Sequence, residues 1–332
     1  PKELDMLASL LDGMNEGSDE AAGATSASKR PSADGNTGIR NGGNLSVALG
    51  TMELCRGDTG LLLSIPRQGL GNAAIAAVAN DEQLARFKGK WAAMAITEPS
   101  CGSDSAAIRT TAVKDGDDYI LNGEKIYVTA GARAECVVVW ATLDKSLGKA
   151  AIKSFVVEHG TPGMEITRLE HKLGIKASDT AAINFSNCRV PAANLLGTPE
   201  IDLKKGFAGV METFDNTRPL VAAMAVGVAA ASIERMKELL ANHIDPNYGT
   251  PPLNTSHAEA TLYRLEAEWE AARLLTLKAA WMADNKMPNS KDASICKAKA
   301  GRVANEVTLK CVELAASLGY GEEELLEKWS RD

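Results

Sequence analysis

Residues 94–104 of this 332-residue chain read Met94-Ala-Ile-Thr-Glu-Pro-Ser-Cys-Gly-Ser-Asp104, close to the point where helical sequence gives way to β-rich sequence. The pattern predicts a strand that ends at Thr97 and a turn at Pro99. After the turn, Gly102 and Ser103 expose backbone N–H groups and a hydroxyl. Such groups can bind an anion or the hydrogen-bonding edge of a heterocycle. On residue type alone, the stretch could equally be an ordinary polar turn.

The zone from about residue 91 to residue 200 is predicted to consist of strands. Its short runs of apolar and β-branched residues are punctuated by Gly and by Asp-Gly pairs. The pair Asn122-Gly123 stands between two such runs and predicts the turn of a β-hairpin. We therefore expect an antiparallel barrel or sandwich and not alternating β-α-β units. The predicted strands include residues 119–121, 126–129, 136–142 and 154–157.

Helical periodicity dominates on both sides of this zone. Long helices joined by short connections form a bundle, so the chain after residue 203 is predicted to be one. Between the two N-terminal helices lies an aperiodic Gly- and Ser-rich stretch, residues 26–44. The predicted helices cover residues 3–11, 45–54, 203–240 (interrupted at Pro219), 257–284 and 290–318. We thus predict an α+β protein with an N-terminal helical domain (1–92), a central antiparallel β-domain (93–200) and a C-terminal helical bundle (201–332).

Composition excludes several classes of function. The net charge of −7 counts against nucleic acid as the main partner, because a phosphate backbone needs a positive surface. The six cysteines have no Cys-x-x-Cys spacing and no neighbouring histidine, so no metal site is expected. Their scatter through apolar runs indicates reduced thiols inside a cell. No run of 18 uncharged apolar residues predicts a membrane span. We expect a cytoplasmic location, or the mitochondrial matrix if the source is eukaryotic.

Six stretches, in order along the chain, resemble landmarks of the acyl-CoA dehydrogenase family of flavoproteins. Together they cover roughly residues 45–332, and their order makes the resemblance specific where a single stretch would be weak. The stretches are ITEPSCGSD (96–104), GEKIYVTAG (123–131), KLGIKASDT (172–180), VPAANLLG (190–197), FDNTRP (214–219), and GY (319–320) with EKWSRD (327–332).

The resemblance implies α,β-dehydrogenation of an acyl-CoA thioester with FAD, and an electron-transferring flavoprotein as the electron acceptor. In such enzymes a carboxylate removes the α-proton while the β-hydrogen leaves as hydride to the flavin. Tyr127 stands where the family usually has a bulky aromatic residue. The residues matched to flavin contacts are Met94, Ile96, Thr97, Gly102, Ser103, Tyr127 and Thr129. The residues matched to substrate contacts are Ser103, Asp215, Thr217 and Arg218, although Arg218 could also be a helix-start residue paired with Asp215.

The resemblance leaves the catalytic base unassigned. Many members place a Glu a few residues beyond the Arg-Asp pair that ends this sequence. Others place it on the long helix, at the position of Thr217, and Glu212 lies off that helix face. We expect the base to lie beyond Asp332, and we expect further residues to be missing within 26–44.

A second departure concerns the segments that hold the flavin of a neighbouring subunit in this family. Residues 242–256 lack the usual Arg-x-x-Phe-Gly, Glu313 replaces a Gln, and Ala316-Ser317 replaces Gly-Gly. A Cβ and a negative charge would both disfavour a pyrophosphate there. We therefore expect a homo- or hetero-oligomer, with a second acyl-CoA dehydrogenase-like subunit and about one flavin per two chains as the favoured form.

Two alternatives remain from the sequence. An acyl-CoA oxidase would differ in the rapid reaction of its reduced flavin with oxygen. A non-catalytic subunit that completes a partner's active site is favoured by the missing base and the altered clamp, and opposed by the intact flavin segments.

Overall fold

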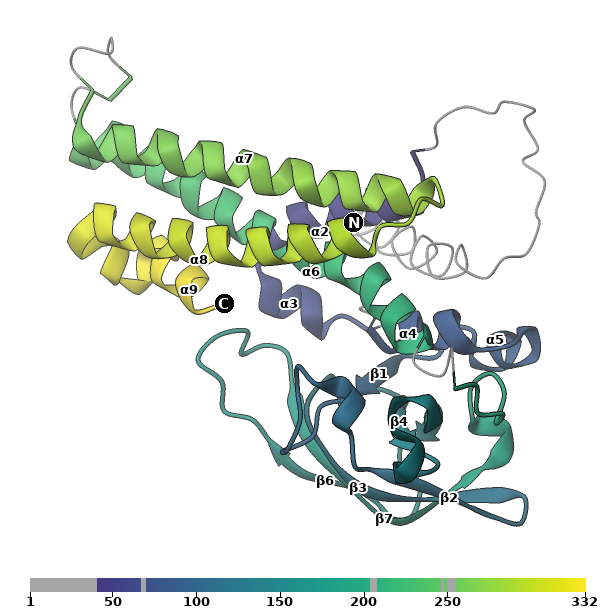
Figure 1. Cartoon of the computed structure of the whole chain (residues 1–332). Coiled ribbons are helices and arrows are strands. Elements are labelled where there is room, and N and C mark those ends of the chain that lie inside the picture. The colour runs from purple at the N-terminus through teal and green to yellow at the C-terminus, as the bar shows by residue number, and fades with distance from the viewer. Residues whose placement is uncertain (1–40, 67–69, 204–207, 246–247, 250–254) are drawn as a thin grey trace, which may run out of the picture. The chain divides into compact units, whose positions relative to one another are not determined.

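The computed structural model describes residues 41–66, 70–203, 208–245, 248–249 and 255–332 (Figure 1). They form two compact units. Within the described part, the first unit comprises residues 63–172 and 176–214, and the second comprises 41–62, 173–175 and 215–332. The helix expected over 3–11 and most of the stretch 26–44 lie outside the described residues. The three-domain boundaries stay a prediction.

The first unit is built on a seven-stranded sheet with the order β1-β4-β2-β3-β7-β6, in which β5 also pairs with β4. Its strands are β1 (Ala92–Ala95), β2 (Thr111–Asp115), β3 (Asp118–Thr129), β4 (Cys136–Thr142), β5 (Ile152–Glu158), β6 (Met164–Leu169) and β7 (Thr180–Pro191). The pairings are antiparallel apart from β1–β4 and a single β2–β4 pair, which are parallel. The predicted antiparallel pairing therefore holds for most of the sheet. The β1–β4 pair is parallel because the chain passes through β2 and β3 before it returns beside β1 in the same direction.

Asn122-Gly123 is not a hairpin turn, and that prediction is wrong. Both residues lie inside β3, at a register shift in its pairing with β7. The β2–β3 hairpin instead turns at residues 116–117, where Gly116 has a φ of +60°. Gly123 serves close packing: its φ is +152°, and a Cβ would lie 2.4 Å from Thr110 Oγ1. A glycine is thus needed at position 123 because Thr110 packs closely against it, and not because the chain reverses there.

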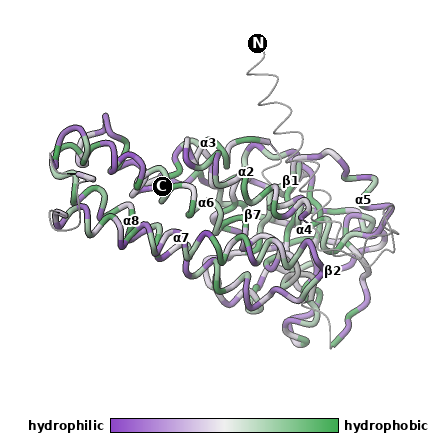
Figure 2. Tube along the Cα trace, turned by 90° about the horizontal axis from the view of Figure 1, so that it is seen from above, coloured by the Kyte–Doolittle hydropathy of each residue, from purple (hydrophilic) through white to green (hydrophobic). Residues whose placement is uncertain are grey.

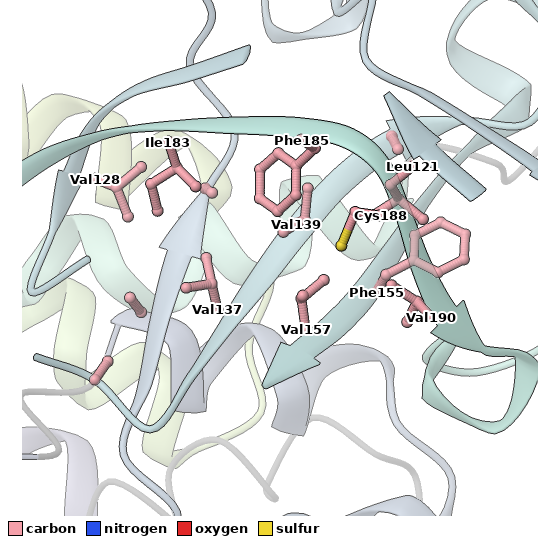
Figure 3. Packing of buried hydrophobic residues seen from close by; sticks show 14 of the residues in the cluster. Leu121, Val128, Val137, Val139, Phe155, Val157, Ile183, Phe185, Cys188 and Val190 are labelled. Atoms are coloured by element: carbon pink, nitrogen blue, oxygen red, sulfur yellow. The ribbon is translucent and has the colours of Figure 1, made fainter. Parts of the chain in front are cut away.

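The core of the sheet is filled by side chains from β3, β4, β5 and β7 (Figure 3). Strand β4 is buried along its whole length, so it shows no alternation of exposure. The rings of Tyr119 and Phe155 meet edge to face, with centroids 5.1 Å apart. Each large apolar side chain buried in this way contributes about 1.5–3 kcal/mol. The labelled members are Leu121, Val128, Val137, Val139, Phe155, Val157, Ile183, Phe185, Cys188 and Val190.

Short helices complete the first unit. Helix α5 begins with a capping box, in which the Asn80 side chain accepts from Gln83 N and the Gln83 side chain accepts from Asn80 N. Gln83 Nε2 also donates to Leu195 O at 2.6 Å, which joins α5 to the loop after β7. The helices are α4 (Leu70–Val78), α5 (Asp81–Phe87) and the 3-10 helices Ser105–Ala107, Lys145–Ala151 and Ala192–Asn194.

The second unit is helical. Its elements are α2 (Gly43–Gly57), most of α6 (Ala208–Leu239), α7 (His257–Asp284), α8 (Ser290–Tyr320) and α9 (Leu326–Arg331), while α3 (Thr59–Ser64) begins in it. Helices α7 and α8 lie side by side (Figure 1), and hydrophilic and hydrophobic residues alternate along α7 (Figure 2). The bounds predicted for α7 are confirmed, and Ser256 caps its start by accepting from Glu259 N. Helix α6 continues through Pro219, so the expected interruption there is wrong.

Two features of these helices are the side-chain cap at the start of α2 and the long apolar stretch of α6. Gly42, at the start of α2, has no side chain to cap the helix, and Asp284 at the end of α7 takes that role. Its carboxylate accepts from Gly42 N (3.0 Å), Asn44 N (2.9 Å), Asn44 Nδ2 (2.9 Å) and Leu45 N (3.1 Å). Within the described residues, the segment Thr213–Ile244 is the one helix long and apolar enough to cross a membrane, but 67% of its most apolar window is buried. A core helix passes the same test.

Candidate functional site

The two segments expected to contact a flavin lie against each other in the first unit. The first runs from β1 through the following turn, and the second is the end of β3. Ile126 N donates to Thr97 O at 2.9 Å, and Lys125 Nζ donates to Ile96 O at 3.0 Å. The end of one segment is thus held directly on the other.

Glu98 organises the turn within the first segment. Glu98 N donates to Cys101 O at 2.9 Å and Cys101 N donates to Glu98 O at 3.1 Å, so the chain reverses at Pro99 as predicted. The Glu98 carboxylate accepts from Lys125 Nζ at 2.8 Å, and the two side chains are only 4% and 0% exposed. It also accepts from Arg109 N (2.6 Å), Thr110 N (2.9 Å) and Thr110 Oγ1 (2.6 Å).

The surroundings of this pair favour an ionised Glu98. Burial by itself would raise the pKa of Glu98, but the Lys125 ammonium and the three donors from Arg109 and Thr110 outweigh it and hold the pKa below its usual range. At Lys125 burial dominates and lowers the pKa, although Glu98 opposes the change. The carboxylate therefore remains an acceptor for four donors at neutral pH.

Directly after Lys125, strand β3 bulges. The register with β7 shifts between Lys125 and Val128, and Tyr127 takes a φ of +57°. A β-bulge redirects side chains, and here the Tyr127 residue is 62% exposed. The strand end is supported by Asp179, whose carbonyl accepts from Ala130 N at 3.1 Å and whose side chain accepts from Ala132 N at 3.0 Å.

Three hydroxyls expected to contact the cofactor are available. In the described part of the chain, no hydrogen bond engages the hydroxyls of Thr97, Ser103 or Thr129. Ser103 is exposed, and the two threonines are half-buried. Free hydroxyls beside an exposed aromatic ring fit the polar edge and the flat face of an isoalloxazine.

Not every matched residue presents its side chain. Met94 and Ile96 are half-buried, and part of each side chain packs against an apolar cluster around Val138 and Trp140. A Cβ on Gly102 would meet nothing closer than Thr97 Cγ2 at 3.8 Å. Gly102 is therefore not required by crowding within the described chain.

The residues matched to substrate contacts other than Ser103 lie on α6 in the second unit. Arg218 Nη1 donates to Asp215 Oδ1 at 3.0 Å, so the pairing considered from the sequence does form. Ser290 Oγ, at the start of α8, donates to the same oxygen at 2.9 Å. Thr217 is buried, with 6% of its surface exposed. Asp215 therefore links α6 to the start of α8 and holds Arg218, whose side chain is 28% exposed. Arg218 lies within α6 and is not a helix-start residue.

Two of the sequence landmarks meet within the second unit. Ile175 N donates to Asp332 Oδ1 at 2.7 Å, and Arg331 Nη1 donates to Leu173 O at 3.1 Å. Lys328 pairs with both Asp332 and Asp58, the latter at 3.0 Å. The tip of the KLGIKASDT stretch and the end of the sequence are thus held together.

Sequence reasoning missed the roles of Glu98 and Lys125. A usable signal existed for Lys125: along β3, Tyr119, Leu121 and Lys125 share one parity, and the first two point into the core. A lysine at an inward position needs a buried partner. For Glu98 no comparable signal existed, because a Glu in a Pro-containing turn is usually exposed.

Comparisons with known proteins agree with the landmarks. The family model "Acyl-CoA dehydrogenase, middle domain" matches residues 93–188, and "Acyl-CoA dehydrogenase, C-terminal domain" matches residues 204–332. The rat mitochondrial short-chain specific acyl-CoA dehydrogenase is 35% identical over 73% of this chain and 58% of its own length. The chain spans about three fifths of the length of the curated relatives that it matches at 35–36% identity.

Solved structures give the same result. Butyryl-CoA dehydrogenase from Megasphaera elsdenii superimposes with a TM-score of 0.81 and 32% identity, over 96% of this chain and 83% of that one. A chain in the structure described as the electron transferring flavoprotein of Acidaminococcus fermentans gives a TM-score of 0.76 and 30% identity, over 96% of this chain and 82% of that one.

Proposed function

Because this chain belongs to the acyl-CoA dehydrogenase family, we propose that it acts in the α,β-dehydrogenation of an acyl-CoA thioester with FAD as cofactor. The observation that carries the proposal is the joining of the two flavin-matched segments through Ile126 N and Thr97 O. It brings free hydroxyls and an exposed aromatic ring together on one unit.

In this proposal Thr97, Ser103 and Thr129 hydrogen-bond the polar edge of the isoalloxazine, and Tyr127 packs on its face. Met94, Ile96 and Gly102 contribute through the backbone. When bound, FAD supplies the acceptor for the hydride that leaves the β-carbon. These groups fix the orientation of the ring, which is the main contribution of a protein to cofactor chemistry.

On the substrate side, Arg218 is the proposed cation for the acyl-CoA, and Asp215 is its positioning residue. Held by a hydrogen bond to Asp215, the guanidinium has fewer rotamers to lose on binding a ligand. Thr217 and Ser103 complete the proposed substrate contacts. We assign no residue of this sequence as the base.

Electron transfer to an electron-transferring flavoprotein is the proposed oxidative half-reaction, supported by the similarity to a chain in such a structure. Oligomers are typical of this family, and we propose a hetero-oligomer. Glu313 has a 65% exposed side chain, and Ala316 takes a φ of +48° inside α8. The backbone at Ala316 is thus one that suits glycine, yet the residue carries a Cβ, which supports loss of a pyrophosphate contact. The nearby Glu313 carboxylate pairs with Lys310 at 2.5 Å and so already engages a cation. A cytoplasmic or matrix location stays a prediction.

The test is FAD binding followed by turnover. Purified protein, with any required partner co-expressed, is expected to be yellow and to lose its flavin absorption when an acyl-CoA is added without oxygen. Thr97→Val and Thr129→Val should each weaken FAD binding about tenfold, the loss of one good hydrogen bond. The control is Thr161→Val, whose hydroxyl donates to Glu158 O at an exposed turn. Protein that stays colourless with excess FAD and partner would refute the proposal. Rapid reaction of the reduced flavin with oxygen would instead indicate an oxidase.

A further inference from the structure

The unusual element of the first unit is a charged pair that is almost wholly buried. Lys125 has no exposed side-chain surface, and Glu98 has 4%. Buried ion pairs are weak sources of stability, because the cost of taking both charges out of water is about as large as their attraction. A well-packed apolar pair would stabilise the fold as well or better. The pair therefore contributes mainly to the placement of the backbone around it and little to the net free energy of folding.

The contacts of the pair reach both flavin-matched segments. Lys125 belongs to the second segment, and its ammonium binds Ile96 O at 3.0 Å and Glu98 Oε1 at 2.8 Å, on either side of Thr97. The next residue, Ile126, binds the Thr97 carbonyl. Three consecutive residues of the first segment are thus attached to two consecutive residues of the second.

The attachment lies at the start of the bulge that exposes Tyr127. The register shift begins at Lys125, so Lys125 is the last regular position before the strand leaves its ladder. If Lys125 were released, neither the Thr97 hydroxyl nor the Tyr127 ring would keep a fixed direction, because their backbones would no longer be joined on both sides of Thr97.

We propose that Lys125 and Glu98 are a positioning pair, which sets the relative placement of the two segments that contact the flavin. The inference rests on the proposed function, and it assigns roles to two residues that do not themselves touch the cofactor. The unpaired hydroxyls and the ring make the contacts, and the pair holds the backbone that carries them.

The experiment compares Lys125→Met with two controls. Val190→Ala removes buried volume from the apolar core of the sheet, at the far end of the β3–β7 pairing, and Lys90→Met removes a half-exposed ion pair with Glu158. In the cofactor-free protein, hydrogen exchange at the Ile126 amide should accelerate at least tenfold in Lys125→Met, with the β4 amides unchanged. In the FAD titration, Kd should rise at least tenfold, and the visible absorption band of FAD at saturation should shift. Neither control should change these three quantities by more than twofold.

If Lys125→Met does not fold, the double variant Lys125→Met with Glu98→Gln removes both charges at similar volume, and the same three results are expected of it. Wild-type exchange at Ile126 together with a wild-type Kd and spectrum would overturn the inference, as would equal changes in Val190→Ala. If wild-type protein binds no FAD, the proposed function fails, while the exchange rate at Ile126 still decides whether the pair positions the segments.

Discussion

Replacing Gly123 by Ala tests the close-contact explanation of this glycine and its link to the site through Thr110. The new Cβ would lie 2.4 Å from Thr110 Oγ1 and 2.7 Å from Thr110 Cα, at a φ of +152°. Thr110 cannot move freely, because its N–H and hydroxyl bind the Glu98 carboxylate at 2.9 and 2.6 Å. Backbone strain of about 1–3 kcal/mol and overpacking of about 1–3 kcal/mol give an expected loss of about 2–6 kcal/mol.

The matched control is Gly116→Ala in the true hairpin turn. Gly116 has a φ of +60°, and no atom lies within 4 Å of the position that a new methyl group would take. Only the left-handed backbone therefore costs energy there, about 1–2 kcal/mol. Urea unfolding followed by far-ultraviolet circular dichroism gives both losses. Gly123→Ala should also weaken FAD binding about tenfold, because a displaced Thr110 releases Glu98. Equal stabilities for the two variants would refute the close-contact explanation of Gly123.

Three further predictions concern other parts of the chain. Arg218→Ala should weaken acyl-CoA binding or turnover 10- to 100-fold, roughly 1.4–2.8 kcal/mol, with little loss of stability because the pair is partly exposed; unchanged kinetics with every acyl-CoA tested would remove its assigned role. Asp284→Ala should lower the free energy of unfolding by about 1–2 kcal/mol, the value of an N-cap, and Asp284→Asn by less than half of that in the same urea titration; equal losses would contradict the capping role. The pKa of Glu98 lies below its ordinary 4.5 in the folded chain, so its contribution to stability is complete above about pH 5.5 and declines as the pH falls through the folded value. Between pH 3 and 6, the free energy of unfolding should therefore fall more steeply with decreasing pH for wild type than for Glu98→Gln. Equal pH dependence in the two proteins would count against the ionised pair.

The fold was largely predictable because most of its helices and strands are marked by long periodic or continuous apolar stretches of sequence. The bounds of helix α7 were predicted correctly from its helical periodicity, and those of β4 from seven consecutive apolar or small residues. The prediction of a hairpin turn at Asn122-Gly123 failed because a single sequence does not distinguish a glycine required by close packing from a glycine required by a turn. What distinguishes them is the approach of Thr110, which only the folded chain reveals.

The flavin contacts stay a prediction, whereas the residues that join the two flavin-matched segments were not predicted at all. Thr97, Ser103 and Thr129 were matched through their landmarks, and their hydroxyls are free in the described chain. Glu98 and Lys125 are 27 residues apart and meet only because β1 and β3 converge. The link from Asp215 to Ser290 spans 75 residues and is likewise a product of helix packing. Such contacts between residues far apart in the sequence depend on tertiary packing, which the periodicity of a single sequence does not reveal.

The cap that Asp284 provides for α2 has a consequence for how the chain is made. Its partner Asn44 lies 240 residues earlier, and the described part of the first unit is threaded between them. At about 5–20 residues per second, a ribosome needs roughly 12–48 s to reach Asp284 after it has added Asn44. During that interval, residues 63–214 can emerge and fold, whereas the start of α2 still lacks the carboxylate that caps it. The earliest described helix of the second unit is therefore among the last to be completed.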